Sequence, residues 1–351
     1  MQTQHLTLYR SRRAASIENP HLRLTVLLEG GHIAEIFSKS AQVNPLWTPP
    51  WPSIEPSTYH PSKHPEYGEG PESKLLSGIM GHNLCLDLFG GPSPEEAAAG
   101  MTVHGEASIV AWLVDASQNA IDMQAELPQS RLRVSRRIDL DGPNVRFRES
   151  VENLSQFDRP IAWTQHVTLG PPFLEHRHTQ FRASATRSKV FEEDFGVDGY
   201  LQPAAEFDWP LAPDKSGGLT DLRTYSNAPR SSAFTTHLLD YSLKQAFFTA
   251  FSPAHQLAFG YLWRPADFPW LGIWEENRSR TIPPWNGQTV TRGMEFGVSP
   301  MPESRRQMIE RGSLFGVPGF RWIPAKSTVA VEYWAILELA TAVPDQVQWP
   351  A

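Results

Sequence analysis

Residues 120–153 decide the fold class, and they read AIDMQAELPQSRLRVSRRIDLDGPNVRFRESVEN. Within residues 145–152, the apolar side chains are Val145, Phe147 and Val151, all at odd positions. A spacing in steps of two is the period of a β-strand with one buried face. Asp-Gly-Pro at 141–143 and Pro-Gln-Ser at 128–130 have the residue types of tight turns. The pattern therefore predicts a meander of three antiparallel strands, at residues 120–127, 131–140 and 145–152.

Short strands separated by turns recur along the rest of the chain. A brief helix is predicted after Ser93, which can act as its N-cap, and before Gly100, which can end it. A second short helix is predicted at 303–311. Many strands with turn-rich connections favour a large antiparallel β-sandwich with few short helices over a parallel βαβ sheet. Residues 1–351 are expected to form a single domain. Further strands are predicted near residues 22–28, 31–37, 104–114, 160–169, 243–251, 256–263, 288–298 and 328–338.

Two long segments interrupt this rhythm of strands. Residues 44–72 contain eight prolines together with Trp47, Trp51, Tyr59 and Tyr67. Disordered linkers are poor in aromatic residues, so we expect this segment to fold over one end of the sandwich. There it either supplies substrate contacts, with Trp51 and Tyr67 as candidates, or packs as a flap without a ligand. Residues 191–230 are expected to cover the same end.

Composition narrows the class of protein and its partners. The formal net charge of -7 argues against nucleic acid or an anionic membrane as the main partner. Arginines at 131, 133, 136 and 137 are expected to form a solvated strand face rather than a basic patch. Most of the 12 tryptophans are expected to pack in the core and in loops, and some of them are candidates to line a site for a sugar.

Compartment is predicted from the cysteine count and from the N-terminal residues. The lone cysteine, Cys85, excludes an internal disulfide framework and a CxxC metal site. The first five residues lack the basic-then-apolar pattern of a signal peptide. The sequence has no uninterrupted apolar run of about 18 residues, the length that a membrane-spanning helix needs. A cytoplasmic protein, monomeric or homodimeric, is expected.

Two histidines and a carboxylate form the candidate catalytic group. His166 lies in the run WTQHVTLGPP at 163–172, where Gly-Pro-Pro stops a predicted strand and leaves the imidazole near the rim of a sheet. His104 opens another predicted strand. Glu295 lies in a third, between Met294 and Phe296, so its side chain points away from theirs. A histidine titrates near neutral pH, and a carboxylate that faces inward is costly unless it is used or paired.

In order along the chain, several short motifs resemble those of the galactose mutarotase-like family, the aldose 1-epimerases and their relatives. The resemblance implies a supersandwich fold and covers roughly residues 22 to 340. Each motif alone is weak evidence, and their order and combination carry the comparison. The motifs are EGGHIAEI at 29–36, VHGE at 103–106, QHVTLG at 165–170, FPWLGIW at 268–274 and GME at 293–295.

The resemblance implies an enzyme that opens and closes a sugar ring at its anomeric carbon. A base removes the proton of the C1 hydroxyl while an acid protonates the ring oxygen. By resemblance, Glu295 is the base, His166 is the acid, and His104 holds the ring oxygen or a neighbouring hydroxyl. The implied partner is a small-molecule carbohydrate, with no metal or organic cofactor.

The chain departs from the family pattern in places that bear on substrate binding. His82 and Asn83 stand where the family carries an Asn-Arg pair. Asp240 competes with Asp208, Asp214 and Asp221 for the role of a substrate-binding aspartate. Trp270 and Trp274 are four residues apart and face the same side of one strand, so with Trp263 or Trp285 they are candidates for a sugar platform. Arg264, Arg278 and Arg280 could bind a phosphate or carboxylate group, but they are expected to be ordinary surface arginines. The sequence does not identify the sugar.

Three other functions remain open from the sequence. Glu175, His176 and His178, with His166, could assemble a metal site. The same fold could bind carbohydrate without turnover, because fold does not determine function. Lyase or hydrolase chemistry on an oligosaccharide is the third alternative.

Overall fold

The computed structural model describes residues 6–345, 347 and 350, and residues 1–5, on which the signal-peptide argument rests, lie outside that part. Strands account for 46% of the structure and helices for 6%. The predicted all-β class, with large antiparallel sheets and few short helices, is confirmed. In the described part, no helix is both long enough and apolar enough to span a membrane.

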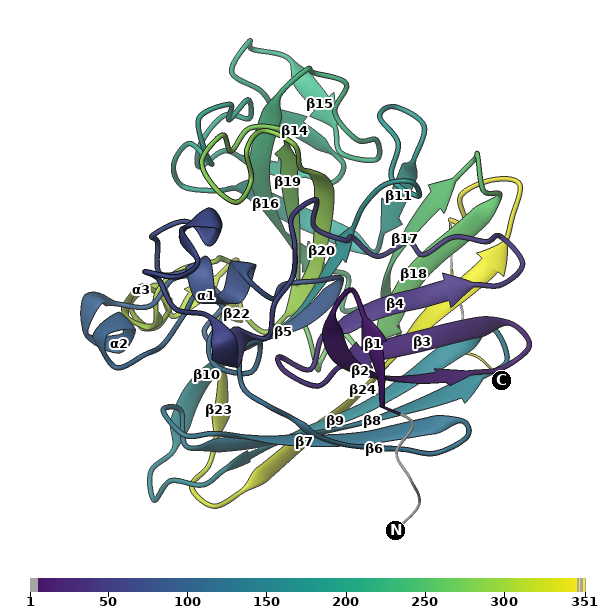
Figure 1. The fold of residues 1–351 in the computed structure, drawn as a ribbon. Helices are drawn as coiled ribbons and strands as arrows, with labels where there is room; N and C mark the ends of the chain where they lie inside the picture. Colours follow the sequence, from purple (N-terminus) through teal and green to yellow (C-terminus); the bar gives the residue numbers. More distant parts are fainter. Residues whose placement is uncertain (1–5, 346, 348–349, 351) are drawn as a thin grey trace.

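The larger sheet has 12 strands and carries the N-terminal part of the chain (Figure 1). Its order is β1-β2-β3-β4-β5-β10-β20-β19-β16-β12-β13, and β23 pairs with one end of β10. The strands are β1 (Leu6–Tyr9), β2 (Arg12–Glu18), β3 (Leu22–Leu27), β4 (Ile33–Ser38), β5 (His82–Asp87), β10 (Arg159–Leu169), β12 (Ala185–Val190), β13 (Glu206–Asp208), β16 (Ser231–Leu239), β19 (Trp270–Asn277), β20 (Val290–Gly297) and β23 (Arg321–Ile323).

The second sheet has eight strands in the order β11-β17-β18-β24-β9-β8-β7-β6. The predicted meander is confirmed here as β7, β8 and β9, which pair in sequence. The strands are β6 (Leu113–Ala116), β7 (Ala120–Leu127), β8 (Leu132–Asp141), β9 (Asn144–Asn153), β11 (Gln180–Ala183), β17 (Ala246–Ser252), β18 (Leu257–Trp263) and β24 (Thr328–Leu339).

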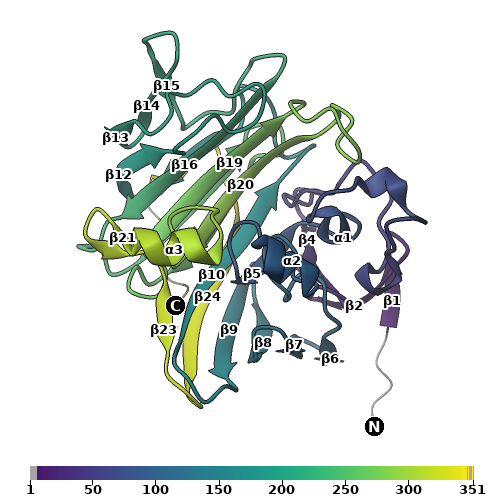
Figure 2. The ribbon, with the colours of Figure 1, turned by 90° about the vertical axis from the view of Figure 1, so that its left-hand side faces the viewer.

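The helices are short and lie on one side of the molecule, where α2 and α3 pass in front of β5, β10 and β20 (Figure 2). Both predicted helices are present, and each begins with a capping box, from Ser93 in α2 and from Ser304 in α3. The remaining elements are α1 (Ser73–Leu76), α2 (Pro94–Ala98), α3 (Arg305–Arg311), η1 (Pro56–Thr58), η2 (Pro65–Tyr67) and the small hairpins β14 (Leu211–Pro213) with β15 (Leu219–Asp221) and β21 (Ser313–Leu314) with β22 (Val317–Pro318).

The prediction of a strand over residues 104–114 is wrong. Only Leu113 begins a strand there, and His104 and Gly105 form a tight turn with φ of 67° and 76°. At Gly105, any Cβ would lie 2.3 Å from the carbonyl oxygen of Leu86. Only glycine allows two backbones to approach this closely. A loop therefore takes the place of the predicted strand.

The main core lies between the two sheets and is rich in aromatic rings. Phe147 and Tyr333 from the second sheet stack at 4.8 Å, and Trp263 stacks on Phe296 of the first sheet at 4.1 Å. Trp263 is therefore part of this core and is not available as a sugar platform. Rings of this size bury the apolar area that holds two sheets together.

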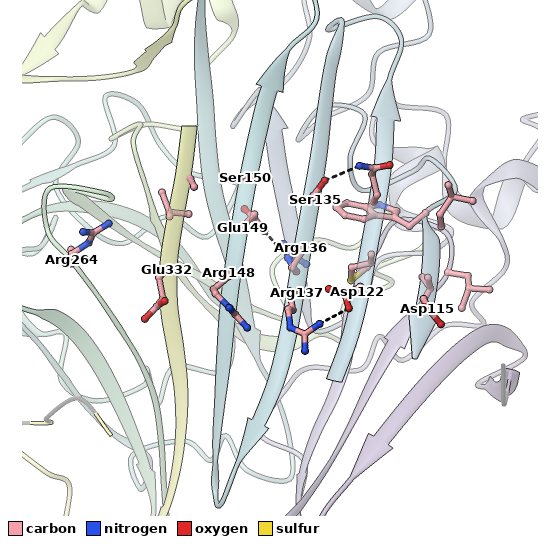
Figure 3. A pocket seen from close by; sticks show the side chains of 18 residues that line it. Asp115, Asp122, Ser135, Arg136, Arg137, Arg148, Glu149, Ser150, Arg264 and Glu332 are labelled. Atoms are coloured by element: carbon pink, nitrogen blue, oxygen red, sulfur yellow. Dashed lines mark hydrogen bonds and ion pairs between the residues drawn. The ribbon is translucent and has the colours of Figure 1, made fainter. Parts of the chain in front are cut away.

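A polar network crosses this core, centred on Arg136 of β8 and Glu149 of β9. Arg136 Nε lies 2.6 Å from Glu149 Oε2, and both side chains are fully buried (Figure 3). The other carboxylate oxygen accepts hydrogen bonds from Trp163 Nε1 at 2.6 Å and Gln165 Nε2 at 2.7 Å, both on β10. The pair thus links the second sheet to the strand that carries His166. A buried charge is tolerated when it is paired and hydrogen-bonded in this way.

The expected solvated face of arginines is wrong for Arg136. In β8 the pleat places Arg136 with Val134 and Ile138 on the inner face. Arg137 points outward and pairs with Asp122, as Figure 3 also shows. Glu149 stands opposite Arg136 in the register of β8 and β9, and this partner makes the inward arginine possible.

We expect Arg136→Met to lower the free energy of unfolding by about 3–5 kcal/mol, because it leaves the Glu149 carboxylate buried without its counter-ion. Urea unfolding followed by tryptophan fluorescence measures the change. The matched control is Arg306→Met, since Arg306 pairs with Glu310 at the surface, where an ion pair contributes little to stability. An Arg136→Met loss as small as that of the control would contradict a structural role for the buried pair.

Candidate active site

His166 and Glu295 stand directly opposite each other on neighbouring strands. The register of β10 and β20 pairs His166 with Glu295, and the register of β5 and β10 pairs Asn83 with His166. The pleat points Trp163, Gln165 and Val167 into the core between the sheets, so His166 faces the other side of the larger sheet. The candidate site therefore lies on the outer face of this sheet, on the side covered by the short helices.

The imidazole and the carboxyl group are close enough to exchange a proton. His166 Nε2 lies 3.1 Å from Glu295 Oε1, and His166 Nδ1 lies 2.9 Å from Thr168 Oγ1. The contact with Glu295 lacks the alignment of a hydrogen bond, and Oε1 is buried without a hydrogen-bond partner among the described residues. A buried acceptor without a partner is uncommon in folded proteins, and a catalytic role is one of its explanations.

Gly293 makes room for the Glu295 side chain, and Gly272, on the neighbouring strand, makes room for the Phe234 ring. At Gly293, a Cβ would lie 2.3 Å from Glu295 Oε1, and at Gly272, which pairs with Glu295 across β19 and β20, a Cβ would lie 2.9 Å from the ring of Phe234. Any larger residue at either position would collide with these groups. Position 293 in the GME motif thus allows the carboxyl group to fold back along its own strand.

His104 reaches the same place from the loop that follows α2. Its ring centroid lies 4.8 Å from that of His166. Its Nδ1 lies 2.7 Å from the carbonyl oxygen of Phe89. A carbonyl can only accept, so Nδ1 carries the proton and Nε2 is left as an acceptor. The structure thus brings His104, His166 and Glu295 together, although His104 does not come from a strand.

These three residues line a cavity of about 420 Å³. Its walls include Trp274, whose ring is 5.8 Å from that of His166, and Trp285, which meets Trp274 edge to face at 6.0 Å. Arg280 and Glu72 also line the cavity, and the Arg280 guanidinium lies over the Trp285 ring at 4.7 Å. The volume and the apolar walls are those of a small-molecule site.

Burial disfavours charge on all three groups. It raises the pKa of Glu295 well above its ordinary value and lowers the pKa of His166 well below its own, with the neighbouring His104 adding to the effect on His166. Burial also lowers the pKa of His104 to about 4. The direction of each shift favours a resting site without net charge, in which the proton resides on Glu295 and both imidazoles are neutral.

Two of the residues predicted to bind substrate are close to the cavity. Trp274 lines it directly. Asn83 is on the same face as His166 but is covered, because it is fully buried and its Nδ2 donates to Ser108 Oγ at 3.2 Å. Trp51 does not line the cavity and packs behind its wall, edge to face with Trp285 at 5.0 Å. Its indole nitrogen donates to the carbonyl of Leu76.

The structure places the other predicted substrate-binding residues away from the cavity. His82 points between the sheets, where it bonds to Tyr261 and Gln165. Trp270 donates to the carbonyl of Pro318, and the Tyr67 hydroxyl donates to that of Pro52. Asp240 accepts from Ser242 in the turn after β16. We leave these four out of the proposed site.

Sequence reasoning missed Thr168, Phe195, Phe234 and Glu72, and it expected Arg280 at the surface. Thr168 could have been found, because it follows His166 by two residues and so shares its face of β10. Phe195 and Glu72 belong to the two long segments, and each of them lines the cavity. They line the cavity because of tertiary packing, and no local sequence pattern predicts this.

No group of three His, Cys, Asp or Glu side chains in the described part of the chain is arranged to hold a metal ion. His176, the centre of the metal hypothesis, bonds through Nδ1 to the carbonyl of Ser226 at 2.6 Å and packs against Tyr225. A larger hollow of about 990 Å³ lies along β6, β7, β8, β9 and β24 (Figure 3). There Arg137 and Arg148 are already paired with Asp122 and Asp139, so it is a weaker candidate.

No protein-family model matches the chain, and no curated protein matches its sequence. Solved structures match its fold. A provisionally assigned aldose 1-epimerase from Klebsiella pneumoniae has a TM-score of 0.68 and 13% identity, over 96% of this chain and 82% of that one. Another from Escherichia coli has a TM-score of 0.62 and 14% identity, over 93% and 99%.

A galactose mutarotase-like protein from Clostridium acetobutylicum is similar as well, with a TM-score of 0.61 and 12% identity over 95% of this chain and 98% of that one. The chain therefore has the galactose mutarotase-like fold that its motifs predict, with a sequence far diverged from these proteins. At such identities the likeness shows the fold, and the activity has to be argued from the site.

We expect the stability advantage of the wild type over His104→Gln to shrink as the pH falls from 6.5 to 4. The pKa of folded His104 is depressed to about 4, while the unfolded chain binds the proton near pH 6.5, so acid favours unfolding of the wild type. The slope approaches about 1.4 kcal/mol per pH unit. Urea unfolding at several pH values measures it, with His178→Gln at an exposed position as control. A pH-independent difference would contradict a buried, neutral His104.

Proposed function

We propose that this protein is an aldose 1-epimerase, which interconverts the anomers of a sugar through His166 and Glu295. The observation that carries the proposal is the opposed pair, 3.1 Å apart and buried in the lining of a cavity that could hold one sugar ring. Two groups that share one proton can give a proton to one oxygen of the anomeric carbon and take a proton from the other. The fold similarity supports the same class of enzyme.

Ring opening then leaves the total number of protons on the protein unchanged. The Glu295 carboxyl group donates its proton to the ring oxygen, and His166 Nε2 accepts the proton of the C1 hydroxyl. The bond between C1 and the ring oxygen breaks as the C1 carbonyl forms. After rotation about the bond between C1 and C2, the same transfers run backwards and close the ring on the other face. Each transfer leaves a charge behind, and the carboxylate and the imidazolium that form attract each other strongly in the low polarity of the cavity.

These roles reverse the assignment implied by the family resemblance, in which Glu295 is the base and His166 the acid. The reason is burial, which favours a neutral carboxyl group beside a neutral imidazole over an ion pair. His104 would accept a hydrogen bond from a neighbouring sugar hydroxyl at Nε2, and Trp274 would pack against one face of the ring.

We expect His166→Gln and Glu295→Gln each to lower kcat/KM for mutarotation by about 10²–10⁴-fold, the range typical of general acid–base catalysis. Polarimetry of freshly dissolved α-anomers from a panel of free and phosphorylated aldoses measures the rate above the uncatalysed background. His178→Gln and Glu338→Gln, both at exposed positions, are the matched controls. Wild-type protein that accelerates no sugar would refute the proposal, and saturable binding without turnover would favour a carbohydrate-binding protein.

We also expect Glu295→Gln to be more stable than the wild type at neutral pH, by a margin that grows from pH 5 to pH 8. The folded pKa of Glu295 is raised above the unfolded value, so its contribution to stability is lost as the pH rises through the folded pKa. Glutamine carries no such penalty. Thermal unfolding across this pH range measures the margin. A glutamate kept for structure would instead make the variant less stable throughout.

A further inference from the structure

The cavity has three zones with different chemistry. In one zone, His104, His166 and Glu295 supply polar atoms. At the mouth stand Glu72, Arg280 and Ile282, whose side chain is 65% exposed. The other side chains of the described lining are apolar, and six of them are buried: Leu75, Leu76, Ile79, Phe234, Trp274 and Trp285.

An ordinary hexose would fit this arrangement poorly. With C1 held at His166 and Glu295, the far side of the ring and its exocyclic carbon would lie against the apolar walls. A hexopyranose carries a hydroxyl on nearly every carbon, and each hydroxyl buried without a partner weakens binding. Apart from the proposed catalytic pair, side-chain partners for these hydroxyls are His104, the more exposed Glu72 and Arg280, and the indole N–H of Trp274, which is unpartnered among the described residues. The aliphatic and phenyl side chains of the lining offer none.

Arg280 does not turn the cavity into a site for an anion. Its Nε lies 3.5 Å from Glu276 Oε2, and Glu72 also lines the mouth. The positive charge is thus largely offset by carboxylates before any ligand binds. The guanidinium also lies over the faces of Trp285 and Trp274, at 4.7 Å and 5.6 Å, which supports the wall against which a ring would rest.

We propose that the substrate is a deoxy-aldose, a sugar that lacks a hydroxyl on the carbons far from C1. This rests on the proposed epimerase function and specifies its substrate class. A methyl group in place of a hydroxymethyl group would contact the apolar zone without leaving a polar atom unpaired.

Matched pairs of sugars test the preference. D-Fucose differs from D-galactose, and 6-deoxy-D-glucose from D-glucose, only by the hydroxyl at C6. We expect kcat/KM for mutarotation to favour the deoxy member of at least one pair by about tenfold to a hundredfold, the discrimination that an apolar pocket achieves against an added hydroxyl. Equal or higher values for both parent hexoses would overturn the proposal while leaving the epimerase function intact.

Binding separates this proposal from the one on which it rests. Quenching of tryptophan fluorescence gives Kd for the same four sugars whether or not the protein turns them over, and the same direction of preference is expected. Preferential binding of a deoxy sugar without any acceleration would refute the epimerase function and support the ligand class.

A phosphorylated sugar is the alternative substrate class. Glucose 6-phosphate and an Arg280→Met variant complete the experiment. If kcat/KM is highest for the phosphorylated sugar and Arg280→Met abolishes that advantage, the proposal is overturned in favour of an anion site at the mouth. If Arg280→Met retains the preference for the deoxy sugar, the apolar zone is its source.

Discussion

The buried ion pair between Arg136 and Glu149 is the interaction on which the rest of the structure depends. It lies between two sheets that meet mainly through aromatic side chains, and its carboxylate also accepts from Trp163 and Gln165 of β10. A one-residue slip of β10 would remove both donors from a buried charge, at a cost that the protein could not sustain. The network therefore holds β10 in a single register.

That register determines where the candidate catalytic groups point. Gln165 faces the network, so the next residue, His166, must face the opposite side of the sheet. There it meets Glu295, whose strand neighbours Met294 and Phe296 are held in the core by the same alternation. A stable polar network on one face of the sheet thus supports an unsatisfied acid–base pair on the other.

The pair itself opposes folding at neutral pH, because its surroundings favour the uncharged forms of groups that ionise readily in water. Such a carboxyl group persists where the substrate makes use of it. The apolar walls that shift the two pKa values also decide which ligands bind, since they offer few partners to hydroxyl groups. Catalytic strength and a preference for a less polar sugar would then have one physical source.

The sequence by itself determined the fold class, the meander, the two short helices and that Glu295 faces away from Met294 and Phe296, because two-residue alternation, turn residues and helix caps are local signals. It also singled out His104, His166 and Glu295. Only the tertiary structure decided that His104 comes from a turn, that Arg136 is buried, and which residues of the two long segments line the cavity. Those outcomes depend on partners distant in the chain, such as Glu149 for Arg136, and local periodicity carries no information about such partners.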